Sequence, residues 1–589
     1  MLEFFKKFEF YKIQKRKKMK EIKTYLYIAI SVFALFCLVE FALCFKIAPS
    51  FSRMVYVALI VATLSLVFKS KARFLGTFAL LFVSSGIYAF IFGFFSKNAM
   101  TLKVSLALNI LVIALCFVFL IFVKQKRFFA FIIALILSIP SIIYLIYFSY
   151  TFSYFDTEAL LAVLQTTKGE ALGYIQEQHN FWQYFIIIAF FTAAFIFAKN
   201  IALLELKERN KGFYLCIFAV LIFCAMLGKK VYEGNIFHSF YTNINLFLKD
   251  LKEFRQNENV RINSAQNISI KEQNATFVIV IGESANKNNM SLYGYERTTT
   301  PRLDALSKDE NFIKFTAAYS AHTHTTQTLT YALSAKNQYN DLELSKAITI
   351  IELAKLAGFK TAWISNQAKY GMWGSPLANI ASSADYSVFL NENDHDNKLD
   401  ELLLPELEKY KNLAKSPKNL IIIHTIGSHV RYADRYPNAF ATFGLQSVDK
   451  YDNSVLYSDF IITEILKSAK KFDNFAGMLY FSDHAEDLSG LMHDSNQFRF
   501  GMTYIPFIAY FAPEFSAKNT DLISALKAHQ NSTWTNDLLF NLLSSLLGIK
   551  SSLDEPNNDI SSEFYDANKS RFKTLYGKKF LSEDGNFQR

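Results

Sequence analysis

Residues 276–283 read TFVIVIGE, and this stretch decides the fold of the C-terminal half of the chain. Six residues, most of them apolar, are followed by a glycine and then by a carboxylate. A short apolar run rich in β-branched residues is typical of a strand that is buried on both faces. We therefore expect a buried strand over 276–281, with Gly282 and Glu283 at its carboxyl end. A carboxylate released by such a turn could ligate a cation or could simply be solvated.

Similar short runs recur downstream and alternate with segments of helical periodicity. The expected strands are TAWIS (361–365), NLIIIH (419–424), AGMLYF (476–481) and PFIAYF (506–511), and the clearest helices are expected over 348–357 and 453–470. Strands that alternate with helices predict an α/β domain with a mainly parallel central sheet. In such sheets the reactive groups lie just beyond the carboxyl ends of the strands.

Residues at these strand ends could carry chemistry. Asp483 and His484 directly follow the strand expected over 476–481, and an oxygen beside an imidazole nitrogen suits a zinc-like ion. Thr325 precedes a run of helical spacing, where free N–H groups attract an anion such as a phosphoryl oxygen. A plain helix cap is the competing interpretation of Thr325. His424, His429 and His493 are further candidates, although each could be structural.

The N-terminal half is apolar and predicts a membrane domain. Seven stretches are long enough, or nearly so, to cross a bilayer, at 24–45, 51–68, 74–95, 104–123, 128–148, 181–198 and 213–227. Residues 1–23 hold nine lysines and arginines against three glutamates, which favours a basic cytoplasmic segment and not a nucleic-acid site. Residues 24–228 are then the transmembrane domain, 229–274 a linker or bridging helix, and 275–589 the catalytic domain.

The loop charges predict the orientation. The loops at 69–73, 124–127 and 199–211 are the basic ones, so the positive-inside rule places them with the N-terminus and the C-terminal half outside the cytoplasm. Residues 149–180 form one longer external segment, which we interpret as an interfacial helical hairpin or as a surface that presents a lipid. All five cysteines precede residue 225, which excludes disulfides and a cysteine nucleophile from the C-terminal half.

Five motifs in order resemble the lipid-linked phosphoethanolamine transferases of Gram-negative inner membranes, which belong to the alkaline phosphatase/sulfatase superfamily. They are VIVIGESANKNNMSLYGYERTTTP (278–301), AHTHTTQTLTYALS (321–334), IIIHTIGSHVRY (421–432), YDNSVLYSD (451–459) and YFSDHAEDL (480–488). The resemblance implies a multi-pass α-helical membrane domain joined to an alkaline-phosphatase-like periplasmic domain. It also implies that the protein acts as a monomer in the bacterial inner membrane.

The resemblance further implies the site and the reaction. Glu283, Thr325, Asp483 and His484 would bind one Zn²⁺ ion, with Mn²⁺ as the alternative. Thr325 would be the nucleophile that takes phosphoethanolamine from phosphatidylethanolamine, and His429 and His493 would hold the phosphoryl group. The expected acceptor is an envelope molecule, lipid A or core lipopolysaccharide first.

Two alternatives to this function remain open. One is a phosphoglycerol transferase of the lipoteichoic-acid-synthase type, and the other is a non-catalytic membrane scaffold.

Overall fold

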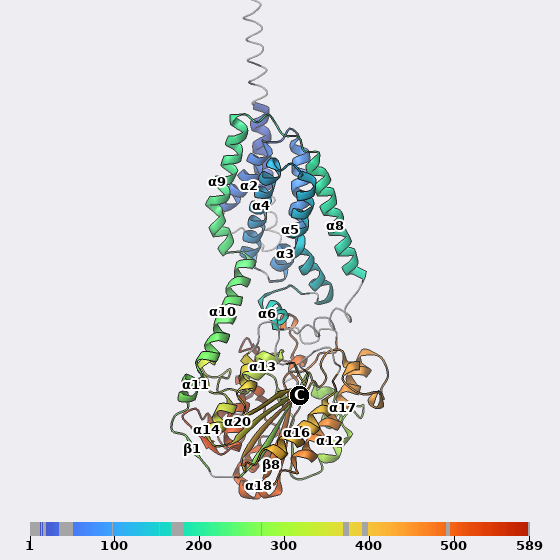
Figure 1. Cartoon of the computed structure of the whole chain (residues 1–589), viewed down its shortest axis with the longest axis vertical. Helices are drawn as coiled ribbons and strands as arrows, with labels where there is room; N and C mark the ends of the chain where they lie inside the picture. Colours follow the sequence, from blue (N-terminus) through green and yellow to red (C-terminus); the bar gives the residue numbers. More distant parts are fainter. Residues whose placement is uncertain are drawn as a thin grey trace, which may run out of the picture. The chain divides into compact units, whose positions relative to one another are not determined.

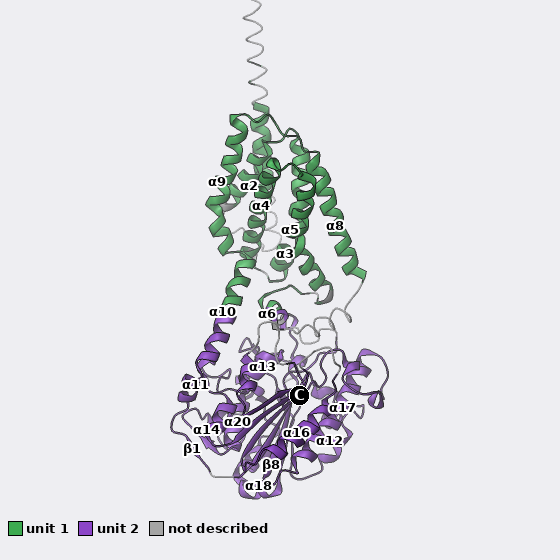
Figure 2. Cartoon of the chain, viewed as in Figure 1, with its two compact units in different colours: residues 1–160, 178–245 green, residues 161–177, 246–589 purple. Residues whose placement is uncertain are grey.

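The computed structural model describes most of the chain as two compact units. The described residues are 12, 15, 19–34, 51–96, 98–151, 153–165, 181–271, 274–368, 376–391, 398–489 and 495–586. One unit comprises residues 1–160 and 178–245, and the other comprises residues 161–177 and 246–589 (Figure 2). Each unit has its own hydrophobic core, so the two are described separately.

The first unit is a bundle of long apolar helices (Figure 1). They are α2 (Phe51–Ser65), α3 (Lys71–Ser96), α4 (Ala99–Phe122), α5 (Lys126–Thr151), α8 (Phe181–Ala202) and α9 (Lys211–Glu233). The short α6 (Thr157–Gln165) after α5 has residues in both units. Within the described residues, five helices are long and apolar enough to cross a membrane, and they match five of the seven predicted stretches. The 15-residue α2 is shorter than a bilayer crossing. The first predicted stretch, 24–45, is described only as far as residue 34, so the total number of spans stays a prediction.

Small and polar residues bring α3 and α4 together. A Cβ added at Gly93 would lie 2.7 Å from the Leu102 side chain, so the helices can approach this closely only because residue 93 is glycine. About two turns before Gly93 in α3, the Ser85 hydroxyl donates to Asn109 Oδ1 of α4 at 2.9 Å, and both side chains are buried. Close backbone approach and interhelical hydrogen bonds are the forces that join helices in lipid, where apolar burial gives little advantage.

The second unit is built on a seven-stranded sheet. Its order is β3 (Phe312–Phe315), β9 (Phe507–Phe511), β8 (Phe475–Ser482), β2 (Thr276–Gly282), β7 (Asn419–His424), β5 (Lys360–Ser365) and β6 (Tyr386–Phe389). The strands from β8 to β6 run parallel, whereas β9 is antiparallel to β8 and to β3. All five predicted strands are present, and the prediction of a mainly parallel sheet is confirmed.

Strand β2 is buried along its whole length because helices cover both faces of the sheet. Phe277, Ile279 and Ile281 belong to one core, and Val278 and Val280 belong to the other. Helices α13 (Thr325–Ala332), α14 (Ile350–Leu356) and α20 (Leu539–Leu546) contribute to the first core, and α12 (Pro301–Leu306), α16 (Leu403–Leu413) and α17 (Ser447–Ala469) to the second. This double coverage explains why the strand sequence is continuously apolar.

The polar segment predicted as a linker or bridging helix is helical in the structure. It contains α10 (Ile236–Gln256) and α11 (Glu258–Ser264). In the second unit, Arg261 of α11 pairs with Glu352 of α14 at 2.7 Å, and both side chains are almost fully buried. Glu352 also accepts hydrogen bonds from the backbone N–H and hydroxyl of Thr349, which caps α14. The end of this segment is therefore packed into the second unit.

Candidate metal centre and nucleophile

Two neighbouring parallel strands bring the predicted metal ligands together. Gly282 at the end of β2 is paired with Ser482 at the end of β8, so Glu283 and the Asp483–His484 pair leave the sheet at the same edge. The side-chain atoms of Glu283, Asp483 and His484 that could ligate an ion all lie within 4.8 Å of one another. His484 Nε2 is 3.3 Å from Glu283 Oε1 and 3.4 Å from Asp483 Oδ2.

This cluster fits a zinc ion. Two carboxylates and one imidazole are ligand types that zinc accepts. All three residues are buried, and Asp483 Oδ2 has no hydrogen-bond partner among the described residues. A buried carboxylate oxygen without a donor is costly, and a bound cation would relieve that cost.

Thr325 is the first residue of α13, as predicted, and it faces the cluster. Its hydroxyl donates to Glu283 Oε2 at 3.1 Å and lies 3.4 Å from His484 Nε2. The helix cap is His324, in an extended backbone conformation, so the competing interpretation of Thr325 as the cap itself does not describe this helix. The structure thus brings all four predicted ligand residues into one site.

The charges of the cluster are strongly coupled. Burial alone would raise the pKa of Glu283, but the hydrogen bond and the charge of His484 lower it well below its usual range. Burial and the neighbouring Glu283 charge raise the pKa of Asp483. Burial would lower the pKa of His484, yet Asp483 and Glu283 raise it to about 10. Without a cation, the site therefore holds a proton on His484 at neutral pH.

Two donors that the sequence analysis missed fix the Glu283 carboxylate. Gln367 Nε2 donates to Glu283 Oε2 at 3.1 Å and to the carbonyl oxygen of Thr425 at 3.0 Å. The Ser284 hydroxyl donates to Glu283 Oε1 at 2.9 Å, and Ser284 holds a left-handed φ of 58°. Gln367 lies two residues beyond β5, so the strand-end rule that identified Glu283 could also have identified it.

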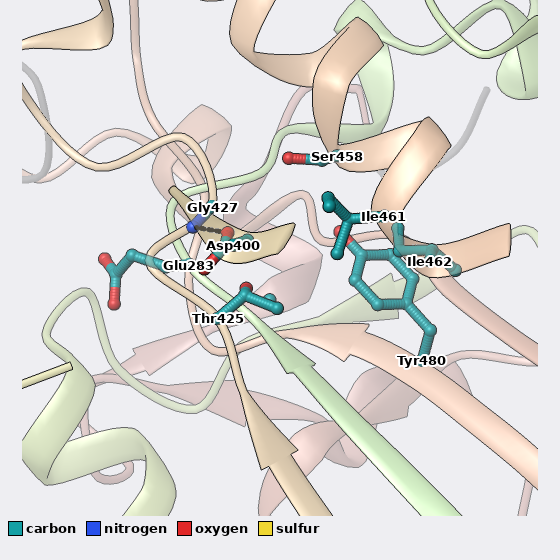
Figure 3. A pocket seen from close by; sticks show the side chains of 9 residues that line it. Glu283, Asp400, Thr425, Gly427, Ser458, Ile461, Ile462 and Tyr480 are labelled. Atoms are coloured by element: carbon teal, nitrogen blue, oxygen red, sulfur yellow. Dashed lines mark hydrogen bonds between the residues drawn. The ribbon is translucent and has the colours of Figure 1, made fainter. Parts of the chain in front are cut away.

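A buried aspartate holds the loop that packs against Glu283. Asp400 accepts hydrogen bonds of 2.9 Å from the backbone N–H groups of Ile426 and Gly427, and the second of these is drawn in Figure 3. Burial raises the pKa of Asp400. A Cβ at Gly427 would lie 2.8 Å from the Glu283 carbonyl oxygen, so only glycine permits this approach.

Glu283 and Asp400 also line a small cavity. Its volume is about 10 Å³, close to what one water molecule needs, and its far wall is formed by Ile461, Ile462 and Tyr480. In Figure 3 the Glu283 carboxylate points away from this wall. A cavity of this size is too small to be a substrate pocket.

The three candidate histidines have different outcomes. His429 follows the loop held by Asp400, and its charge contributes to the lowered pKa of Glu283, after the larger effects of burial and His484. His424 ends β7 and stacks edge-on against Trp363, and burial lowers its pKa to about 4, so it is neutral and structural in character. His493 lies outside the described residues, and its role stays a prediction.

Comparison with known proteins agrees with this architecture. Residues 275–549 match the family described as Sulfatase. Phosphoethanolamine transferase EptC of Escherichia coli O18:K1:H7 is 28% identical over 410 residues, which cover 62% of this chain and 70% of that protein. The Kdo(2)-lipid A phosphoethanolamine 7''-transferase of Salmonella typhimurium is 28% identical over 243 residues, covering 38% of this chain and 42% of that protein.

A solved structure shares the fold over most of the chain. It is the integral membrane protein lipooligosaccharide phosphoethanolamine transferase A (EptA) from Neisseria meningitidis, with a TM-score of 0.58 and 20% identity, and the match covers 82% of this chain and 98% of that one. Residues 275–549 are therefore similar to the Sulfatase family, in a chain that also has five helices, among its described residues, that are long and apolar enough to cross a membrane. The predicted resemblance to phosphoethanolamine transferases is confirmed by relatives of that name.

Proposed function

We propose that this chain, with its sulfatase-family domain, transfers phosphoethanolamine from phosphatidylethanolamine to an acceptor in the cell envelope. The observation that carries the proposal is the position of the Thr325 hydroxyl, 3.1 Å from Glu283 Oε2 and 3.4 Å from His484 Nε2 of the buried cluster. A threonine that faces potential metal ligands from the first turn of a helix is arranged as a nucleophile. The names of the relatives support the transferred group.

The reaction would proceed in two displacements. Thr325 Oγ1 attacks the phosphorus of the donor lipid, the bond from phosphorus to the diacylglycerol oxygen breaks, and diacylglycerol leaves with a proton. An acceptor hydroxyl oxygen then attacks the phosphorus on Thr325, the bond from phosphorus to Thr325 Oγ1 breaks, and the proton of the acceptor returns to Thr325 Oγ1. Glu283 Oε2 accepts the hydrogen bond of the Thr325 hydroxyl and so marks the direction in which its proton departs.

The residues of the cluster would hold a zinc ion between Glu283, Thr325, Asp483 and His484, with Mn²⁺ as the alternative. When bound, such an ion would lower the pKa of the attacking hydroxyl and offset the charge on the phosphoryl oxygens. His429, and His493 beyond the described residues, would donate hydrogen bonds to those oxygens. Donors of this kind stabilise the transition state more than the ground state.

The membrane domain supports a lipid donor. The donor is a bilayer component, so an enzyme held in the same bilayer meets it at a raised effective concentration. The basic N-terminus and basic loops support a cytoplasmic N-terminus and a periplasmic catalytic domain in the inner membrane of a bacterium. The segment at 149–180 could present the lipid, and only its first part, including α6, is described.

The decisive experiment replaces the nucleophile. Full-length Thr325→Ala should lose transfer from labelled phosphatidylethanolamine, while Thr326→Ala, at the next hydroxyl of the same helix, should keep it. Mass spectrometry of the wild-type protein incubated with the donor alone should find phosphoethanolamine on Thr325. Transfer by Thr325→Ala would refute the assignment.

The same assay separates the alternatives and names the acceptor. Labelled phosphatidylglycerol in place of phosphatidylethanolamine tests a phosphoglycerol transferase, and purified protein without stoichiometric metal would favour the scaffold. Mass spectrometry of lipid A, core oligosaccharide and other envelope molecules, from cells with and without the gene, identifies the recipient.

A further inference from the structure

The chain continues for 40 residues beyond the part that matches the sulfatase family, and this extension returns to the nucleophile helix. It contains a small hairpin of β12 (Lys573–Thr574) and β13 (Lys579–Phe580), paired antiparallel. We call residues 573–577 the C-terminal strap. The family match gives this segment no role.

The strap has an unusual backbone. Leu575, Tyr576 and Gly577 have φ angles of 51°, 54° and 83°, so three consecutive residues lie in the left-handed region. Glycine adopts this region easily, but a bulky residue such as Leu575 or Tyr576 does so at a cost. Strain of this kind persists only where the surroundings hold it, and it is concentrated at functional sites.

The contacts that hold the strap lie on both sides of Thr325. The Thr574 hydroxyl donates to the Ser320 carbonyl oxygen at 2.9 Å, and the Tyr576 N–H donates to that of Ala321 at 3.3 Å. The Tyr576 hydroxyl donates to the Gln327 carbonyl oxygen at 2.7 Å. The strap thus bonds to the backbone before Thr325 and to the first turn of α13 after it.

Ring packing covers the same segment. The Tyr576 ring stacks on Tyr331 of α13, with centroids 4.2 Å apart and planes 20° apart. The centroid of the same ring lies 4.9 Å from that of the His322 ring. Tyr576 therefore spans from the approach to α13 to its second turn.

The strapped segment is also tied to the metal cluster. The N–H of Ala321 donates to Asn536 Oδ1 at 2.9 Å, and Asn536 Nδ2 donates to the Asp483 carbonyl oxygen at 2.8 Å. Ala321 is therefore held at its N–H by Asn536 and at its carbonyl oxygen by Tyr576. A shift of the strap would change the position of α13 relative to Asp483.

We propose that the C-terminal strap positions the nucleophile, with Tyr576 as its main positioning residue. This inference rests on the proposed function, in which Thr325 attacks the donor lipid. The strap fixes the start of α13, so that the Thr325 hydroxyl stays aimed at the cluster. A misplacement of about 1 Å at a reacting atom can reduce a rate about a hundredfold.

The test compares full-length variants in detergent with phosphatidylethanolamine as donor. Tyr576→Ala should lower kcat about a hundredfold, with KM for the donor within about twofold of wild type, because Tyr576 acts through α13 and does not touch substrate. Tyr576→Phe keeps the stack and loses one hydrogen bond, so its kcat should fall only about two- to tenfold. Phe580→Ala is the matched control, since Phe580 is an aromatic residue of the same hairpin with a similar exposed fraction, 42% against 36% for Tyr576.

Hydrogen exchange separates positioning from general unfolding. In Tyr576→Ala the amides of residues 320–328 should exchange faster, while those of β2, β7 and β8 stay protected. Wild-type kcat in Tyr576→Ala, or a loss confined to KM, would overturn the inference. If Tyr576→Ala does not fold, Tyr576→Phe decides, and an unchanged kcat there counts against the strap. Failure of the proposed function would appear separately, as absent transfer by the wild-type protein or as transfer by Thr325→Ala.

Discussion

The two sides of the candidate site are built in different ways. On the strand side, Glu283, Asp483 and His484 have exposed fractions of 1%, 0% and 1%, and the register of β2 with β8 fixes their backbone. On the helix side, Thr325 is only half-buried, and α13 depends on loops and on the C-terminal strap for its position. The difference indicates separate roles for the sheet and for the helix. In the proposed function, the sheet would build the ion site before substrate arrives, and the helix would present the group that meets the lipid donor.

The largest expected effect comes from breaking the strand side. Asp483→Asn replaces a buried carboxylate oxygen that has no hydrogen-bond donor among the described residues, so the site loses a charged ligand. We expect metal affinity to fall by more than the roughly 100-fold typical of outer-shell residues, and transfer to fall with it. Metal content of the purified protein and isothermal titration with Zn²⁺ measure this.

Asp487→Asn is the matched control for that variant. Asp487 lies in the same segment, accepts a hydrogen bond from the Ser489 N–H at 2.9 Å and lies 3.8 Å from the exposed Arg499. It should keep wild-type metal content. Stoichiometric zinc in Asp483→Asn would remove Asp483 from the ligand set.

A smaller effect on metal affinity is expected from a change next to Glu283. Glu283 Oε2 accepts hydrogen bonds from both Thr325, on the helix side, and Gln367. Gln367→Ala frees the carboxylate to rotate, so metal affinity should fall about 10- to 100-fold. Competition with a chelator measures the change, and the exposed Gln266→Ala is the control. If Gln367→Ala keeps wild-type metal affinity, the hydrogen bond from Gln367 does not help to hold the Glu283 carboxylate for metal binding.

The last expected effect is a dependence on pH. Because its carboxylate neighbours raise the pKa of His484 to about 10, the metal-free site carries a proton at neutral pH that a cation must displace. Burial and Glu283 also raise the pKa of Asp483 to about 8, so this second ligand is protonated at neutral pH too. Metal affinity should therefore rise at least tenfold per pH unit up to about pH 10 and then level off. Calorimetry at pH 7 in two buffers of different ionisation enthalpy should report between one and two protons released per ion. A binding heat independent of the buffer would contradict the coupled charges described for this cluster.

The sequence predicted the strand side of the site well. Parallel strands share one carboxyl edge, so Glu283 and the Asp483–His484 pair could be placed together without knowing the strand order. Thr325 was placed at a helix start by the spacing of the residues that follow it. The strand ends and the helix start followed from local patterns and from one general property of parallel sheets, whereas the set of four ligands for one ion came from the family resemblance.

The remaining features depend on contacts between residues far apart in the chain. Strand β3 and the antiparallel direction of β9 follow from pairing that no local pattern specifies. Tyr576 meets Gln327 across 249 residues of sequence, and nothing in the residues around Tyr576 indicates that partner. The sequence analysis could therefore identify Thr325 but not the residues of the C-terminal strap that contact its helix.

The buried Arg261–Glu352 pair sets where an isolated catalytic domain should begin. A fragment cut at residue 275, where the family match starts, would keep the Glu352 carboxylate in the interior and discard its cation. Breaking a buried pair in this way costs about 3–5 kcal/mol, a large part of the 5–15 kcal/mol that stabilises a typical domain. An isolated second unit should therefore begin upstream of Arg261, within a stretch that its composition alone predicts to be a spacer.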